Sequence, residues 1–228
     1  MDAQSRLEKC SLCGKEHFVS NPGALKQALF CGICARKLQI DKLQPLEYKQ
    51  LLLSVIPPKY IEAEIEHLPK PIAALIEKDI ETGVYLWGDV GTGKTYAMSA
   101  LAKHYLKNGY LCHRIHYELL CLQLRDTFKP ASKQTELEIL IPLFSVDRLF
   151  IEDVGATRGI GKEETDHSRR TLLLLLDIRL EKKLPTFITG NKSVENLEAS
   201  FDERIADRIK TYEIFSMKGK SKRQPPAG

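Results

Sequence analysis

The stretch GDVGTGKT, Gly88–Thr95, follows directly on the apolar run VYLW at residues 84–87. It fits the pattern G-x-x-x-x-G-K-[ST] in full, and the residues after it favour a helix. Glycines allow backbone N–H groups to turn inward around a phosphate without a Cβ in the way. A helix that begins near Lys94 points the positive end of its dipole at the same place. The stretch therefore predicts a phosphate-binding loop between a strand and a helix.

The side chains of this loop narrow the choice of ligand. Lys94 is a mobile cation for the β- and γ-phosphates of a nucleotide, and the hydroxyl of Thr95 is placed to bind Mg²⁺. A glycine-rich turn that matches by chance is the alternative, and the strand and helix on either side argue against it. We expect ATP and Mg²⁺ to be held by the whole loop, namely Gly88, Asp89, Val90, Gly91, Thr92, Gly93, Lys94 and Thr95.

The rest of the chain alternates between short apolar runs and longer helical patterns. The predicted strands are residues 84–88, 110–117, 148–155, 184–191 and 211–217. The predicted helices are residues 94–109, 118–128, 135–144, 164–183 and 196–209. Alternation of this kind is typical of a parallel sheet with helices on both faces. Ahead of the first strand, residues 61–83 are expected to be helical, with interruptions near Pro69 and Pro71.

An acidic pair ends one of these strands. RLFIEDVG, residues 148–155, is an apolar strand that closes on Glu152 and Asp153. Ligands of open α/β sheets bind at the carboxyl ends of the strands, where such side chains lie. Solvated acids at a strand end are the alternative interpretation. Beside a complete phosphate loop, we interpret the pair as the acids that hold magnesium.

Two C-x-x-C knuckles lie near the N-terminus, Cys10 with Cys13 and Cys31 with Cys34. The spacing between them is typical of a four-thiolate zinc site. Because four cysteines leave no open position for chemistry, we expect a structural zinc ion. A redox pair and ordinary buried cysteines are the alternatives, and His17 is a spare candidate ligand.

Composition sets wider limits. A chain of 228 residues suffices for one domain with a small appendage, or for two modest domains. The formal net charge of +4 is too mild to indicate a nucleic-acid partner by itself. The longest apolar run, at residues 172–176, is too short to span a bilayer, and no secretory signal is visible, so we expect a cytoplasmic protein. The pair Pro57-Pro58 favours a boundary between a zinc module, 1–54, and a second domain, 55–228.

Taken together, the motifs resemble those of AAA+ ATPases. GDVGTGKT, LFIEDVG, PTFITGN and DERIADRI occur in the order and spacing of that family. More narrowly, they resemble bacterial replicative helicase loaders of the DnaC/DnaI type and the related IstB-like helpers of transposition. IPPKY and FSMKGKSKR, at the two ends of the core, are similar to the same group. The resemblance covers residues 55–223 and implies an α/β, P-loop AAA+ (ASCE) three-layer core.

The resemblance also implies roles for individual residues. Glu152 and Asp153 match the Walker B pair, in which Glu152 would hold Mg²⁺ with Thr95 and Asp153 would orient the attacking water. Asn191 matches the polar sensor-1 residue. Two arginines match those that act on the nucleotide of a neighbouring subunit, namely Arg204 and Arg208. An arginine supplied in this way stabilises charge on the transferred phosphoryl group.

The sequence departs from the family at the acidic pair, which usually reads Asp-Asp or Asp-Glu. Asp153 is one methylene shorter than glutamate, about 1.5 Å less reach. Slow hydrolysis is therefore expected, and the roles of Glu152 and Asp153 could be reversed. A second departure, shared with the loaders, is that the chain ends soon after FSM, so no C-terminal helical lid is expected.

The residues alone leave other interpretations of the arginines and Asn191 open. ERIADRI is also a plain amphipathic helix with its charges outward, and Asn191 could cap the helix that follows it. Neither Arg204 nor Arg208 has an obvious acidic partner outside its own helix. We therefore expect both to face across a subunit interface.

The function that the resemblance implies is the ATP-dependent loading of a replicative DnaB-type helicase. The zinc module would grip the helicase, and the ATPase would self-associate through its ATP site. Single-stranded DNA would contact the loop with Arg158 and Lys162, although a solvated loop is the alternative. An IstB-like helper of transposition is the alternative function, and the zinc module favours the loader. A metabolic P-loop kinase would need a small-molecule pocket and a lid that the sequence does not reveal.

Overall fold

The computed structural model describes residues 6–19, 31–78, 80–155, 166–219 and 221. Its centre is a five-stranded sheet with the order β4-β5-β6-β3-β7, in which every pair of neighbours is parallel. The strands are β3 (Gly83–Trp87), β4 (Cys112–His116), β5 (Arg148–Val154), β6 (Thr186–Gly190) and β7 (Glu213–Ser216). The predicted parallel sheet is confirmed, and each observed strand falls within or within one residue of a predicted run.

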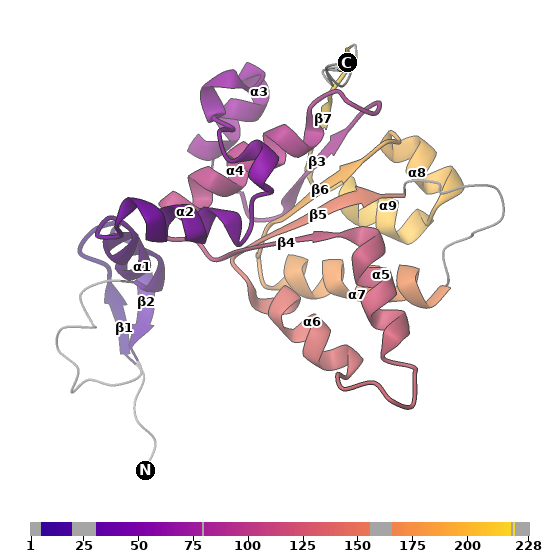
Figure 1. Ribbon diagram of the computed structural model, residues 1–228, viewed down its shortest axis with the longest axis horizontal. Helices are drawn as coiled ribbons and strands as arrows, with labels where there is room; N and C mark the ends of the chain where they lie inside the picture. The colour runs from indigo at the N-terminus through magenta and orange to yellow at the C-terminus, as the bar shows by residue number, and fades with distance from the viewer. Residues whose placement is uncertain (1–5, 20–30, 79, 156–165, 220, 222–228) are drawn as a thin grey trace.

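Helices cover both faces of this sheet, which gives three layers (Figure 1). One face carries α4 (Lys94–Lys107) and the segment that precedes β3. The other face carries α5 (Tyr117–Asp126), α6 (Glu136–Ser145), α7 (Asp166–Glu181), α8 (Val194–Ser200) and α9 (Glu203–Ile209). The central strands β3, β5 and β6 are almost wholly buried, as their apolar runs predict, whereas the edge strands β4 and β7 are only partly buried. Phe150 and Phe187 stack beneath α4, while Ile151 and Ile188 lie in the opposite core.

The segment before β3 differs from its prediction. Residues 61–83 were expected to be largely helical, but only short turns form there. They are η2 (Ile65–His67), α3 (Lys70–Ala73) and η3 (Ala74–Glu77), and they follow the regular helix α2 (Pro45–Leu53) and the short turn η1 (Pro58–Tyr60). The prolines lack the N–H that a continuing helix requires, so Pro57 and Pro58 stand at the start of η1, and Pro69 and Pro71 at the start of α3. The segment is held instead by apolar side chains packed against α4, such as Ile56, Ile72 and Leu75.

The N-terminal residues form a small module. It contains an antiparallel pair, β1 (Arg6–Lys9) and β2 (Glu16–Val19), and the helix α1 (Gly32–Ile40). The module lies near the amino-terminal ends of β4 and β5 (Figure 1). Arg36 of α1 donates one hydrogen bond to the carbonyl of Gly109, at 2.7 Å, and pairs with Asp147 at 2.5 Å. Contacts therefore cross the predicted boundary between the two domains.

Gly109 shows how close this contact is. Its φ is +86°, and a Cβ there would lie 2.2 Å from the carbonyl oxygen of Ile33. The first turns of α1 thus rest directly on the bend that joins α4 to β4, and glycine leaves room for that approach.

Within the part of the chain described here, no helix has the length and apolar character needed to cross a membrane.

Candidate functional site

The predicted phosphate loop forms between β3 and α4. Gly88, Gly91 and Gly93 have φ values of +153°, +86° and +100°. These are values that side chains with a Cβ rarely adopt, which accounts for glycine at each position. Gly93 is the N-cap of α4, so the helix begins at Lys94 as predicted. The backbone N–H groups of the first turn, which have no carbonyl partner within the helix, therefore lie at the loop.

Lys94 is buried and reaches back into its own loop. Its ammonium group donates to the carbonyl oxygens of Gly88, at 2.7 Å, and Asp89, at 2.9 Å. The hydroxyl of Thr92 also donates to the carbonyl of Asp89, at 2.9 Å. The loop is thus closed from inside by a cation that sits where a phosphate would be neutralised.

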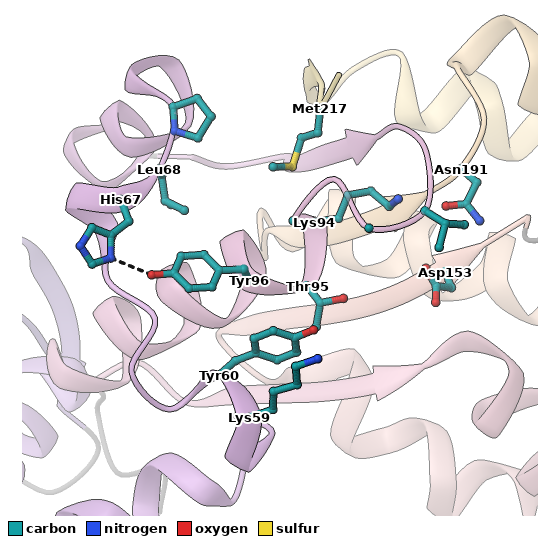
Figure 2. Close-up of a pocket in the computed structure, with 14 residues that line it drawn as sticks. Lys59, Tyr60, His67, Leu68, Lys94, Thr95, Tyr96, Asp153, Asn191 and Met217 are labelled. Atoms are coloured by element: carbon teal, nitrogen blue, oxygen red, sulfur yellow. Dashed lines mark hydrogen bonds between the residues drawn. The ribbon is translucent and has the colours of Figure 1, made fainter. Parts of the chain in front are cut away.

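A cavity of about 600 Å³ lies next to the loop. Figure 2 shows the side chains that surround it, with Lys94 and Thr95 from the loop, Asp153 from the end of β5 and Asn191 from the end of β6. The volume falls in the range of small-ligand pockets. The cavity thus brings together four side chains that the sequence predicted to share one site.

Asp153 sits at a break in the sheet. The register between β5 and β6 shifts between Ile151 and Val154, and Asp153 has a φ of +58°. Its backbone N–H donates to the hydroxyl of Thr189, at 3.0 Å, in place of a regular ladder bond. Its carboxylate lies 3.1 Å from Nε2 of His116. The bulge turns this acid toward the cavity, as bulges next to sites commonly do.

Glu152 has different surroundings. It is 3% exposed and makes a two-point ion pair with Arg114 of β4. It lies two residues after Phe150, so it projects from the sheet face that carries α4. Glu152 is nevertheless not among the residues that line the cavity. The structure therefore places the two acids differently, with Asp153 at the cavity and Glu152 beside it in the grip of an arginine.

Asn191 lines the cavity, and the structure removes its alternative role. The N-cap of α8 is Ser193, whose side chain accepts a hydrogen bond from the backbone of Asn196. Asn191 is therefore not the cap of that helix, and its amide faces the cavity next to Asp153 (Figure 2).

Sequence reasoning did not find the wall of the cavity opposite Asn191. Tyr60, His67 and Tyr96 form it, with His67 Nδ1 2.8 Å from the hydroxyl of Tyr96. Tyr60 and Tyr96 meet edge to face, with ring centroids 6.5 Å apart. The one available signal was the position of Tyr96 directly after the loop. The others come from a segment whose turns place aromatic groups in no regular period.

Arg114 and His116, the partners of the acidic pair, were also missed. They lie on either side of Ile115 in β4. This alternation of polar and apolar residues is typical of an exposed edge strand. Their role became visible only when β4 was paired with β5.

The two arginines of α9 do not line the cavity. Arg204 pairs with Asp202, the N-cap of the same helix, at 3.1 Å. Arg208 donates to Asp177 of α7 at 2.8 Å. The expectation that neither arginine has an acidic partner outside its helix was wrong for Arg208. The partner is 31 residues away in sequence and becomes a neighbour because α7 packs beside α9.

Arg158 and Lys162, the predicted DNA contacts, lie outside the described residues.

The four knuckle cysteines come together at the start of α1. Their Sγ atoms all lie within 4.8 Å of one another, and Cys13 and Cys31 are 3.8 Å apart. Zinc–sulfur bonds of about 2.3 Å in a tetrahedron place sulfurs about 3.8 Å apart. None of the cysteines in the described part of the chain is in a disulfide, and His17 is not part of the group. The geometry therefore fits a structural zinc ion held by Cys10, Cys13, Cys31 and Cys34.

The surroundings of the cluster act differently on its thiols. A hydrogen bond from the backbone of Cys31 is the main cause that lowers the pKa of Cys10 to about 6. Burial raises the pKa of Cys34, and its neighbouring cysteines add to that effect. Four close sulfurs cannot all ionise without a cation, because like charges disfavour one another. A zinc ion would resolve this conflict.

We expect the Cys13→Ser variant to lose the metal. The wild-type protein should contain about one zinc per chain by elemental analysis, because all four thiolates are needed for a closed site. The variant should lose order in the module while binding nucleotide with nearly unchanged affinity. The Cys112→Ser variant is the matched control, since Cys112 lies in β4 and should not affect zinc content. Metal-free wild-type protein with an ordered module would contradict the assignment.

Comparisons with known proteins bear on this site. No profile of a known protein family matches the chain. It is 26% identical over 123 residues to the replicative helicase loader DnaC of Buchnera aphidicola subsp. Acyrthosiphon pisum, across 54% of this chain and 48% of that protein. It is 23% identical over 140 residues to the replicative helicase loader DnaI of Bacillus subtilis, across 61% of this chain and 42% of that protein. The chain thus spans about half the length of the curated relatives it matches.

A solved structure of DnaI shares the fold. It superposes with a TM-score of 0.62 at 20% identity, over 76% of this chain and all of that one. The resemblance inferred from the motifs is therefore confirmed: this chain is similar to the DnaC and DnaI helicase loaders, and its core has the same three-layer α/β fold as the DnaI structure.

Proposed function

We propose that this protein is an ATP-dependent loader of a replicative DnaB-type helicase and acts in the cytoplasm. The observation that carries the proposal is the cavity where the phosphate loop, Asp153 and Asn191 meet, in a chain similar to proteins named as helicase loaders. The zinc module would bind the helicase. The ATPase core would associate with copies of itself and bind single-stranded DNA, partly through Arg158 and Lys162.

Nucleotide binding follows from the loop. The backbone N–H groups of residues 89–95 would surround the phosphates, and Lys94 would leave the carbonyls of Gly88 and Asp89 to neutralise them. The adenine base would lie toward Tyr60 and Tyr96, whose rings supply an apolar wall.

The acids would divide the remaining work. Thr95 and Glu152 offer the oxygen ligands that Mg²⁺ prefers, and the bound ion would polarise the phosphoryl oxygens. Arg114 would fix the carboxylate of Glu152 in one orientation. Asp153, turned to the cavity by the bulge, would accept a proton from the attacking water, while Asn191 orients that water.

A capture experiment tests the proposed partner. The replicative helicase of the same organism, immobilised as its hexamer, should retain the wild-type protein, and the Cys13→Ser variant should be retained at least tenfold less, because the module loses its fold. The retained protein should then transfer the helicase to closed circular single-stranded DNA only when ATP is present. Capture by a transposase of the same organism, with none by the helicase, would favour the IstB-like alternative instead.

A further inference from the structure

The segment that follows β7 lies against the phosphate loop. Met217 donates its backbone N–H to the carbonyl of Trp87, at 2.7 Å, which extends the pairing of β7 with β3 to the edge of the loop. Its side chain lines the cavity beside Lys94 (Figure 2). We call residues 217–219 and 221 the C-terminal strap.

Two glycines of the loop are in close contact with this strap. A Cβ on Gly88 would lie 2.2 Å from the carbonyl oxygen of Met217. A Cβ on Gly91 would lie 2.1 Å from Oγ and 2.8 Å from Cβ of Ser221. Real Cβ atoms do not approach other atoms so closely. Glycine at positions 88 and 91 is therefore required for two reasons. It adopts the positive φ, and it leaves space for the strap.

The strap and Lys94 both contact the loop, at different residues. Lys94 closes it from within, through hydrogen bonds to Gly88 and Asp89. Ser221 is itself exposed, is not among the residues that line the cavity, and contacts the loop at Gly91. A bound phosphate would take the ammonium of Lys94 away from both carbonyls. The loop would then keep its shape through its own backbone, the hydrogen bond from Thr92 to Asp89 and the strap.

We propose that the C-terminal strap is a positioning segment that preorganises the phosphate loop for nucleotide, with Ser221 on Gly91 as its main contact. This inference rests on the proposed nucleotide binding for its effect on affinity, but the contact itself does not. A loop held in its binding shape loses less conformational freedom when the ligand binds, which raises affinity without a new ligand contact.

Two truncations separate the strap from the residues beyond it. Removal of 218–228 should weaken binding of a fluorescent ADP analogue about tenfold and accelerate hydrogen exchange of the loop amides at 88–93. Removal of 222–228 keeps the strap and should change affinity less than about twofold. Exchange is measured without nucleotide, so it reports on the strap even if the wild-type protein binds no nucleotide. A wild-type protein that binds no nucleotide would contradict the proposed function. The role of the strap would then be tested by the exchange rates alone.

A double-substitution cycle tests the contact with point variants that keep the chain length. Gly91→Ala should weaken nucleotide binding and accelerate hydrogen exchange of the loop amides. Both effects arise partly from strain at positive φ and partly from the clash with Ser221. Ser221→Gly removes the clashing atoms, so Gly91→Ala should cost severalfold less affinity in that background. Equal cost of Gly91→Ala in both backgrounds, with unchanged loop exchange after removal of 218–228, would overturn the proposal.

Discussion

Replacing Asp153 by asparagine is expected to lower the rate of ATP hydrolysis by about 10²–10⁴-fold, the usual contribution of a general base. ATP·Mg²⁺ should still bind, because the loop and Thr95 are untouched. The structure supports this assignment, since Asp153 faces the cavity while Glu152 is held by Arg114. Single-turnover hydrolysis and equilibrium nucleotide binding, measured on the same preparation, separate the two effects.

Glu152→Gln is the matched control for that experiment. It keeps the shape of the side chain and one acceptor for Arg114, so the half-buried guanidinium keeps a partner. We expect it to weaken the Mg²⁺ dependence of nucleotide binding more than the turnover of bound ATP. If Glu152→Gln stops turnover and spares binding, while Asp153→Asn weakens Mg²⁺-dependent binding, the roles of the two acids are the reverse of those proposed.

A mixture of two inactive variants is expected to regain ATPase activity. Lys94→Ala should lose nucleotide binding because the loop loses its cation. Arg208→Ala should bind nucleotide but turn it over about 10³–10⁵-fold more slowly, if its guanidinium completes the site of the neighbouring subunit. In mixed assemblies, some interfaces join an intact loop to an intact arginine, so partial activity returns. Activity against the mixing ratio is the measurement.

Asp177 provides a control that the sequence alone did not suggest. Arg208 is bound to Asp177 at 2.8 Å, so it must leave this carboxylate to reach a neighbour. Asp177→Asn weakens that hold and should leave hydrolysis intact or raise it. Arg204→Ala, mixed in the same way, tests the other arginine. Absence of recovery with either arginine variant, in assemblies shown to exchange subunits, would exclude the shared site.

The core was predictable from sequence because its signals are local. Buried parallel strands appear as short apolar runs, and the loop pattern fixes both ends of one strand-to-helix connection. Cys10, Cys13, Cys31 and Cys34 were predictable for the same reason, since two-residue spacing brings sulfurs together within each knuckle.

The remaining features depend on neighbours that only folding provides. Arg114 of β4 meets Glu152 of β5, and Arg208 of α9 meets Asp177 of α7. Ser221 meets Gly91 because β7, which precedes Ser221, pairs with β3, which precedes Gly91. The helix predicted over residues 61–83 was wrong for another reason. The apolar residues of this segment suit a helix, but its prolines interrupt one. Propensity and packing there favour different structures, and packing against α4 decides.

The pairing of Arg36 with Asp147 determines how far a partner bound to the zinc module would lie from a nucleotide bound in the cavity. Asp147 lies just before β5, and Asp153 near its end, so the zinc module and the cavity are separated by the length of that strand, about 20 Å. A large partner bound to the module would therefore lie at the opposite end of β5 from the cavity that would bind nucleotide. The partner and the nucleotide could be bound at the same time, and nucleotide exchange could proceed while the partner stays bound to the module.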